Sequence, residues 1–175
     1  MAKRIDLRAY QENIANRLAA AQSGPGVPAL LGFESAGVRW LLDLPAAGEV
    51  LPLPPLSVVP LTRHWFAGLA SVHGELQSVV DFAAFCGAHP APRDSRARIL
   101  RVGVRHGNNV ALLVERVFGL KRTDALFAAE AADELDLGPW QGQAFTDTQG
   151  ERWTRLELTR LFADPAILDA ALREN

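Results

Sequence analysis

The chain has 175 residues, of which 49% are hydrophobic, with a formal net charge of −2 and one cysteine. This composition excludes a disordered chain, and it excludes general electrostatic attraction to nucleic acid or anionic membranes. Cys86 alone cannot form an internal disulfide, and no apolar run approaches the roughly 18 residues that a membrane span requires. Polar residues follow Lys3 and Arg4 where a signal peptide needs an apolar segment, so we expect a soluble cytoplasmic protein.

The N-terminal segment is predicted to form an amphipathic helix over residues 5–21. A Gly24-Pro25-Gly26 breaker follows it, so residues 1–26 are interpreted as a helical extension. The extension either packs on its own domain or serves as a partner-binding arm. Its apolar stripe has spacings of three, four and four and consists of Leu7, Tyr10, Ile14 and Leu18.

The first half of the remaining chain resembles two hairpins joined by a proline-rich passage. Because proline removes donors from a strand ladder, Pro45–Pro60 is expected at a sheet edge or in an extended connection. Asp81 is placed to cap a short turn over residues 82–86. Strands are predicted at residues 30–34, 38–44, 67–73 and 76–82.

The second half begins after a polar connection, His89–Arg98, that contains two prolines. Residues 123–137 are rich in alanine and acids and predict a short helix or a loop. Asp164-Pro165 predicts the start of a final helix that runs to about Arg173, because a cap followed by a first-turn proline is a typical helix start. Strands are predicted at residues 98–105, 109–117, 118–122, 142–146 and 152–158.

Two stretches of the chain repeat one plan. Superposing the turn glycines Gly74 and Gly150 places Asp81 on Glu157, and we interpret these two acids as matching caps. Because one hairpin is marginal alone, two hairpin sets are expected to close into two small barrels that share a core or exchange strands. The repeated hairpins are Leu30–Leu44 with Ile99–Val117, and Ala67–Phe85 with Gly142–Phe162.

No constellation of reactive residues stands out. The chain has no phosphate-binding glycine loop, nucleophile elbow or dinucleotide fingerprint. Cys86 and His89 have a spacing that fits one face of a metal ion, but a structural zinc site needs four ligands and no second pair exists. A cysteine in an apolar turn normally behaves as a small hydrophobe. We therefore expect no catalytic residue, no metal and no cofactor.

An arginine cluster supports an alternative hypothesis, a double-barrel module that binds nucleic acid or another ligand. No aromatic side chain is interleaved with the arginines, as a surface for single strands would need, so solvent exposure for solubility is the favoured interpretation. The aromatic pair Trp65-Phe66 is either a core lid or an interface anchor. The cluster consists of Arg93, Arg96, Arg98, Arg101 and Arg105.

Three blocks have a characteristic order and spacing: Gly68–Gly74 (GLASVHG), Ser78–Phe82 (SVVDF) and Leu112–Val117 (LLVERV). Together they resemble the CheW family, the adaptors of bacterial chemosensory arrays. Trp65 and the Ala83–Gly87 block look most like the PilI branch, which serves the chemosensory system of type IV pili and twitching motility.

The chain departs from the family pattern in its central block. His73 stands where the family has arginine, Ser71 where it has asparagine and Ser78 where it has proline. A histidine lacks the planar five-donor guanidinium of arginine, so an arginine-dependent receptor contact would be altered.

The resemblance implies a mainly β CheW-like domain at residues 27–175, with two five-stranded SH3-like barrels nominally at 27–97 and 98–163 and a C-terminal helix at 164–173. It implies a non-catalytic adaptor that couples a methyl-accepting chemoreceptor to the regulatory domain of a CheA-type histidine kinase. We expect it in the cytoplasm at membrane receptor arrays, without membrane insertion or nucleic acid. The receptor-facing groove would lie between the barrels, at Ala47, Gly68, His73, Gly74, Ile99, Val117 and Leu120. The kinase would contact the edge of the first barrel at Glu49, Val50 and Leu51.

Overall fold

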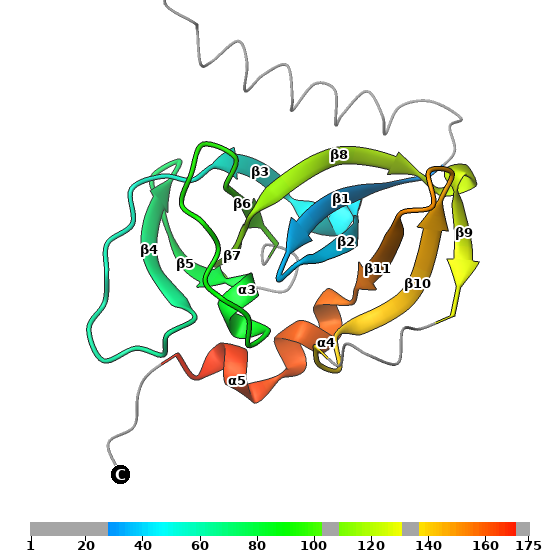
Figure 1. Ribbon diagram of the computed structural model, residues 1–175. Helices are drawn as coiled ribbons and strands as arrows, with labels where there is room; N and C mark the ends of the chain where they lie inside the picture. Colours follow the sequence, from blue (N-terminus) through cyan, green and yellow to red (C-terminus); the bar gives the residue numbers. More distant parts are fainter. Residues whose placement is uncertain (1–27, 103–108, 131–136, 171–175) are drawn as a thin grey trace, which may run out of the picture.

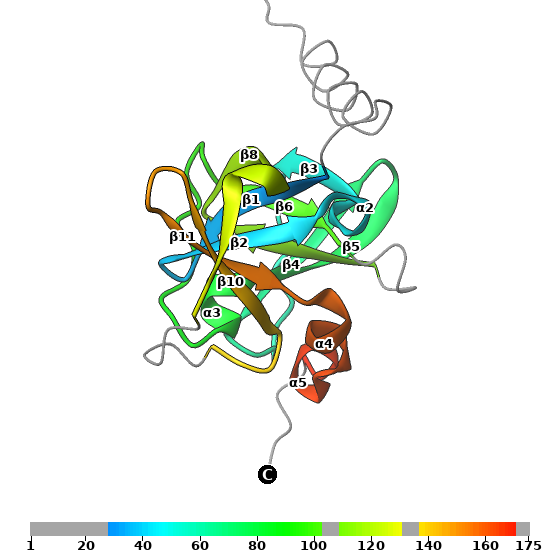
Figure 2. The same cartoon turned by 90° about the vertical axis from the view of Figure 1, so that its right-hand side faces the viewer.

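The computed structural model describes residues 28–102, 109–130 and 137–170. Two sheets pack against each other, and the short helices at residues 82–85, 158–163 and 165–168 lie at one end of the molecule (Figure 1, Figure 2). The fold is mainly β, as predicted, whereas the predicted N-terminal helix lies outside the described residues. Within the described part of the chain, no helix combines the length and apolar character needed to cross a bilayer.

One sheet has six strands and the other has five. In spatial order, the six are β8 (Arg116–Arg122), β1 (Ala29–Ser35), β2 (Val38–Asp43), β11 (Arg152–Leu156), β10 (Gln141–Asp147) and β9 (Leu126–Ala129). The five are β3 (Glu49–Pro52), β6 (Arg98–Arg101), β7 (Val110–Val114), β5 (Glu75–Asp81) and β4 (Phe66–Val72). The helices are α2 (Leu44–Ala47), α3 (Phe82–Phe85), the 3₁₀ helix η2 (Thr123–Ala125), α4 (Leu158–Ala163) and α5 (Pro165–Leu168).

The predicted hairpins form where turn chemistry allows them. In the β1–β2 turn, Ala36 and Gly37 both have positive φ angles, 58° and 70°, and His73 and Gly74 repeat this in the β4–β5 turn with 52° and 81°. Two consecutive residues with positive φ match the twist of the flanking strands. The proline-rich passage forms one strand, β3, at the edge of its sheet, which confirms the expected edge position.

The two repeats exchange their hairpins reciprocally. The β1–β2 hairpin of the first repeat pairs with β8 and β11 of the second, and the β6–β7 hairpin of the second repeat pairs with β3 and β5 of the first. Each exchanged hairpin meets the other repeat through one parallel strand pair, β2 with β11 in the six-stranded sheet and β7 with β5 in the five-stranded sheet. The nominal boundary between residues 97 and 98 therefore falls inside the five-stranded sheet.

Three apolar clusters hold the sheets together. The largest fills the space between the sheets, where Trp40 and Phe82, both 0% exposed, make an edge-to-face contact with centroids 5.3 Å apart. A second lies within the five-stranded sheet and includes Ile99 and Leu51. A third lies within the six-stranded sheet around Trp153. We call the first cluster the inter-sheet core.

The duplication extends to the tryptophans that precede β4 and β10. The backbone N–H of Asp81 donates to the Trp65 carbonyl at 2.8 Å, and that of Glu157 donates to the Trp140 carbonyl at 2.9 Å. Trp65 is 5% exposed, so its role is in the core. Phe85 contacts both indoles, with centroid distances of 5.2 and 5.1 Å.

The expectation of two matching caps is half right. The Asp81 carboxylate accepts from the N–H of Ala84 at 3.1 Å and caps α3. Glu157 also begins a helix, α4, but its side chain makes no capping bond and instead lies 3.6 Å from the Arg155 guanidinium. The longer glutamate side chain favours the arginine over its own helix N-terminus.

Sequence reasoning was wrong or incomplete at three places. Residues 123–137 are predicted as a short helix or a loop, and η2 is such a helix, but β9 follows it, because pairing with β10 overrides the low β-propensity of an alanine-rich segment; residues 131–136 lie outside the described part. The helix α4 was not predicted. The last helix starts as expected, with Asp164 capping Ala166 at 2.8 Å, but it ends at Leu168; residues 171–175 are outside the described part.

Candidate functional site

The candidate docking surface lies beside the edge strands β3 and β8, which hold equivalent places in the two sheets. Both ribbon views place these strands at the same end of the molecule (Figure 1, Figure 2). Val50 on β3, and Val117 and Leu120 on β8, each pair with a residue of the inter-sheet core, so their side chains project toward that core. Val50 and Val117 are half-buried, and Leu120 is 39% exposed. We call Val50, Val117 and Leu120 the inter-sheet rim.

The helix α2 supports the β3 side of this rim. A proline in its first turn begins the helix, and Gly48, with φ of 52°, ends it. A Cβ atom at Gly48 would collide with the backbone carbonyl of Arg101, so glycine is needed for the chain to enter β3. Ala47 is thereby packed into the inter-sheet core with 2% exposure, where it supports the surface from below.

Two predicted site residues face away from the rim. Ile99 is 0% exposed and Leu51 is 7% exposed, and both belong to the core within the five-stranded sheet. The strand β6 is buried on both faces, since Leu100, which follows Ile99, belongs to the inter-sheet core and is also 0% exposed. In this structure, Ile99 and Leu51 can shape the strands but offer almost no surface to a partner.

Gly68 has a backbone role. It lies at a register irregularity of β4, has φ of 132°, and its added Cβ would stand 2.6 Å from the carbonyl oxygen of Ser57. That carbonyl accepts the N–H of Leu69 at 2.9 Å, and Ser57 donates in return at 2.8 Å. A side chain at Gly68 would therefore disrupt the contact that covers the β4 edge.

A charged network lies at the turn end of the five-stranded sheet. The His73 ring nitrogen Nε2 lies 2.9 Å from Oε1 of Glu49, and Arg101 donates to Glu75 at 2.6 Å and to Glu49 at 3.4 Å. The network connects β3, β5, β6 and the β4–β5 turn that also carries Gly74. One residue predicted for the receptor, His73, thus contacts one predicted for the kinase, Glu49.

This network is mostly solvent-exposed, which limits its contribution to stability. The side chains of His73, Glu49 and Glu75 are 56%, 37% and 62% exposed, whereas Arg101 is 12% exposed. Exposed ion pairs each contribute about 0.2–1 kcal/mol. The charges are therefore available to a partner at little cost to the fold.

In the described residues, Arg93 of the arginine cluster is exposed, and Arg96, Arg98 and Arg101 have partners within the chain. Arg96 forms a two-pronged pair with Asp94, and Arg98 donates to two backbone carbonyls. Arg101 is engaged by the network above, and Arg105 lies outside the described residues. The geometry gives the nucleic-acid alternative no additional support.

Of the remaining candidates for chemistry, Asp81 is buried, Cys86 is half-buried and His89 is exposed. Burial raises the pKa of the Cys86 thiol to about 12, so the thiol stays neutral. Burial also raises the pKa of Asp81, although the amides of Ala84 and Ala91 act in the opposite direction. Across the described residues, no three His, Cys, Asp or Glu side chains gather in a way that could hold a metal ion.

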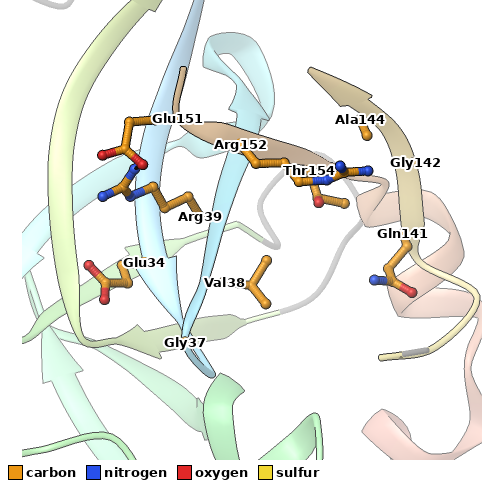
Figure 3. A pocket seen from close by; sticks show the side chains of 10 residues that line it. All are labelled: Glu34, Gly37, Val38, Arg39, Gln141, Gly142, Ala144, Glu151, Arg152 and Thr154. Atoms are coloured by element: carbon orange, nitrogen blue, oxygen red, sulfur yellow. Dashed lines mark ion pairs between the residues drawn. The ribbon is translucent and has the colours of Figure 1, made fainter. Parts of the chain in front are cut away.

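A hollow of about 460 Å³ that sequence reasoning did not foresee opens beside β2, β10 and β11 (Figure 3). The parallel pairing of β2 with β11 covers two residue pairs, whereas β5 and β7 pair over four. The wall of the hollow carries two acids and two arginines, of which Arg39 and Glu151 form an ion pair. The charges of these four side chains balance.

Comparison with known proteins places this geometry in a family. The model of the CheW-like domain matches residues 29–165, which include every strand of both sheets. The chain belongs to the CheW-like family. The crystal structure of the scaffolding protein TtCheW from Thermoanaerobacter tengcongensis has a similar fold, with a TM-score of 0.64 and 17% identity over 78% of this chain and 88% of that one.

A curated relative is similar in sequence as well. The protein PilI of Pseudomonas aeruginosa is 32% identical over 103 residues, which is 58% of this chain. The alignment spans about half the length of that relative, 54%. The resemblance to the PilI branch of the CheW-like family, first indicated by Trp65 and the Ala83–Gly87 block, is thereby confirmed.

Proposed function

We propose that this CheW-like protein is a non-catalytic adaptor that couples a chemoreceptor to a CheA-type histidine kinase. The observation that carries the proposal is the inter-sheet rim, where an exposed Leu120 and a half-buried Val117 stand on an edge strand above a core of apolar side chains. Exposed apolar groups at a strand edge suit the docking of a protein partner. The similarity to TtCheW, described as a scaffolding protein, and to PilI supports this function.

The finer proposal assigns the protein to the chemosensory system of type IV pili and twitching motility. Its support is the sequence similarity to PilI and the Trp65 and Ala83–Gly87 blocks. The protein would work in the cytoplasm, attached to membrane receptor arrays through its partners.

The receptor contact is proposed at the β8 part of the inter-sheet rim, Val117 and Leu120, and at the β4–β5 turn. A receptor tip is a helical hairpin, and such a helix binds by placing apolar side chains into an apolar surface. Val117 and Leu120 would make the direct contacts, with His73 and Gly74 at the turn. Ala47, Gly68 and Ile99 would act as supports, because they are buried.

The kinase contact is proposed at the edge strand β3. An edge strand presents unpaired backbone groups and can be extended by a partner. Glu49 offers a carboxylate that is 37% exposed, Val50 offers a half-buried side chain, and Leu51 anchors the strand from within. Because Glu49 contacts His73, the receptor and the kinase would meet at this end of the sheet.

Substitutions at the rim test the receptor assignment. Leu120→Asp should weaken binding of a receptor-tip fragment by at least about 2 kcal/mol, because docking would bury the new charge. The matched control is Val58→Asp, at a position that is 78% exposed on the β3–β4 connection. Isothermal titration calorimetry with the receptor fragment and with the kinase regulatory domain measures both contacts. Unchanged receptor affinity in a folded Leu120→Asp variant would refute the assignment.

A further inference from the structure

Arg101 is the least exposed member of the charged network at the turn end of the five-stranded sheet. Its side chain is 12% exposed, whereas the side chains of Glu49 and Glu75 are 37% and 62% exposed. The guanidinium lies between these two carboxylates, because Nη1 donates to Oε2 of Glu49 at 3.4 Å and Nη2 donates to Oε2 of Glu75 at 2.6 Å. One arginine of β6 therefore connects β3, on one side of β6, with β5, beyond β7 on the other side.

The stability of the fold does not account for an arginine at this place. The Nε–H of Arg101 is buried and has no hydrogen-bond partner among the described residues, and an unpaired buried donor costs folding free energy. Ion pairs with carboxylates that remain in contact with water offset little of that cost. What Arg101 does provide is a fixed orientation for the acidic side chains that it contacts.

The backbone places Glu49 beside this guanidinium. Glu49 and Arg101 are opposite each other in the antiparallel pairing of β3 with β6, so their side chains project from the same face of the sheet. Gly48 precedes Glu49, and a Cβ atom at Gly48 would collide with the carbonyl of Arg101. The chain thus enters β3 in close contact with Arg101, and the Glu49 carboxylate is already held by a cation at the sheet edge.

Position 73 reaches the same carboxylate from the β4–β5 turn. The Nε2 atom of His73 lies 2.9 Å from Oε1 and 3.1 Å from Oε2 of Glu49. The CheW-like pattern has arginine at this position, whereas this chain has an imidazole, which lacks the planar five-donor fork of a guanidinium. The guanidinium that contacts Glu49 in this chain comes instead from Arg101.

We propose that Arg101 is a positioning residue for the kinase contact: it holds the Glu49 carboxylate in place on β3 and substitutes for the arginine that the chain lacks at position 73. A carboxylate that is ordered before binding loses less conformational freedom when the partner arrives, so the complex is tighter. This proposal rests on the assignment of the kinase contact to β3 made above.

Isothermal titration calorimetry of the full chain with the regulatory domain of a CheA-type kinase measures this role. Arg101→Met keeps most of the apolar stem but removes the guanidinium, and it should weaken kinase binding about tenfold. Arg98→Met is the matched control on the same strand, because the Arg98 guanidinium donates to the backbone carbonyls of Ser95 and Ala97 instead. Its kinase affinity should stay within about twofold of the wild type, as expected for a surface change away from the contact.

A second substitution distinguishes positioning from a general loss of structure. His73→Arg returns a guanidinium to Glu49 from the turn, so it should raise kinase affinity about tenfold in the Arg101→Met background and by much less in the wild type. Circular dichroism and urea unfolding establish that each variant is folded. If Arg101→Met does not fold, Arg101→Lys, which keeps the charge but not the fork, takes its place with an expected loss of about threefold that His73→Arg again restores.

The outcomes separate this proposal from the proposed function. A loss with Arg101→Met that His73→Arg does not restore, or an equal loss of affinity for the kinase domain and for a receptor-tip fragment, would make Arg101 merely structural and overturn the proposal. Weaker kinase binding by Glu49→Gln together with unchanged binding by Arg101→Met would also overturn it, while the kinase contact at β3 would stand. Unchanged kinase binding in both variants would remove the assignment of the kinase contact to β3 itself.

Discussion

Phe82 is the side chain whose removal should most clearly reveal how the two sheets depend on each other. It follows β5 of the five-stranded sheet, is 0% exposed, and contacts Trp40 and Phe33 of the six-stranded sheet at centroid distances of 5.3 and 6.3 Å. Phe82→Ala removes a complete aromatic ring from the inter-sheet core. Buried Phe→Ala changes cost about 3–5 kcal/mol, and we expect about 4 kcal/mol. That is a large part of a typical unfolding free energy of about 5–15 kcal/mol.

Urea unfolding followed by tryptophan fluorescence and by far-UV circular dichroism measures this effect. Both signals should report one cooperative transition for the wild type and the variant, because the exchanged hairpins join the sheets. Phe127→Ala, at a position that is 58% exposed on β9, is the control and should change stability by less than about 0.5 kcal/mol. A cost below about 1.5 kcal/mol for Phe82→Ala, two separate transitions, or a stable fragment of residues 1–97 would refute the reasoning.

Three further predictions follow from local geometry. Gly68→Ala should destabilise the fold by about 3 kcal/mol, since the new Cβ meets the Ser57 carbonyl. Gly74→Ala, at a position with φ of 81° and open space, should cost about 1 kcal/mol. Urea unfolding midpoints compare the two variants, and equal costs would contradict the steric role of Gly68. Burial acts to raise the pKa of Asp147, but bonds from Trp153, two backbone amides and Lys121 outweigh it, so the pKa is lowered from 3.8. The stability that the ionised Asp147 provides is present above pH 3.8 and is lost as pH falls through the lowered pKa. Asp147→Asn should therefore reduce the loss of unfolding free energy at acid pH, measured by urea titrations between pH 2 and 7. An unaltered dependence of that free energy on pH would argue against the role of Asp147. Cys86, with a pKa of about 12, should resist iodoacetamide at pH 8 in the folded protein and react after unfolding, whereas fast native alkylation would contradict the raised pKa.

The hairpins could be predicted because their signals are local. Alternating apolar residues and turn residues with positive φ, such as Gly37 and Gly74, specify β1–β2 and β4–β5 without reference to the remainder of the chain. The exchange of hairpins has no such local signal. Both repeats follow the same plan, so the sequence of β2 does not reveal whether it will pair with β5 or with β11.

The candidate site was harder to predict because the strands near it are buried on both faces. In β6, Ile99 and Leu100 are adjacent and both fully buried, in different cores, so alternation does not show which one faces the space between the sheets. The resemblance to CheW placed Leu51 and Ile99 among contact positions, yet they lie in the interior. The contact of His73 with Glu49 depends on β3 pairing with β6, which is a property of the tertiary structure.

The role of Gly68 shows a related difficulty. Its position in a family block suggested a groove residue, but its φ of 132° and the nearby Ser57 carbonyl give it a backbone function. An aspartate at position 68 would therefore perturb folding and docking together. Leu120, which is exposed, gives a cleaner test of docking.

The central claim is that one molecule of this protein holds a receptor and a kinase together. Titrating a receptor-tip fragment into the full chain already saturated with a CheA-type regulatory domain tests this most directly, with analytical ultracentrifugation to identify the product. We predict that the receptor fragment binds and that a complex containing all three components forms. Displacement of the kinase domain by the receptor fragment, or failure of either partner to bind the protein, would contradict the claim.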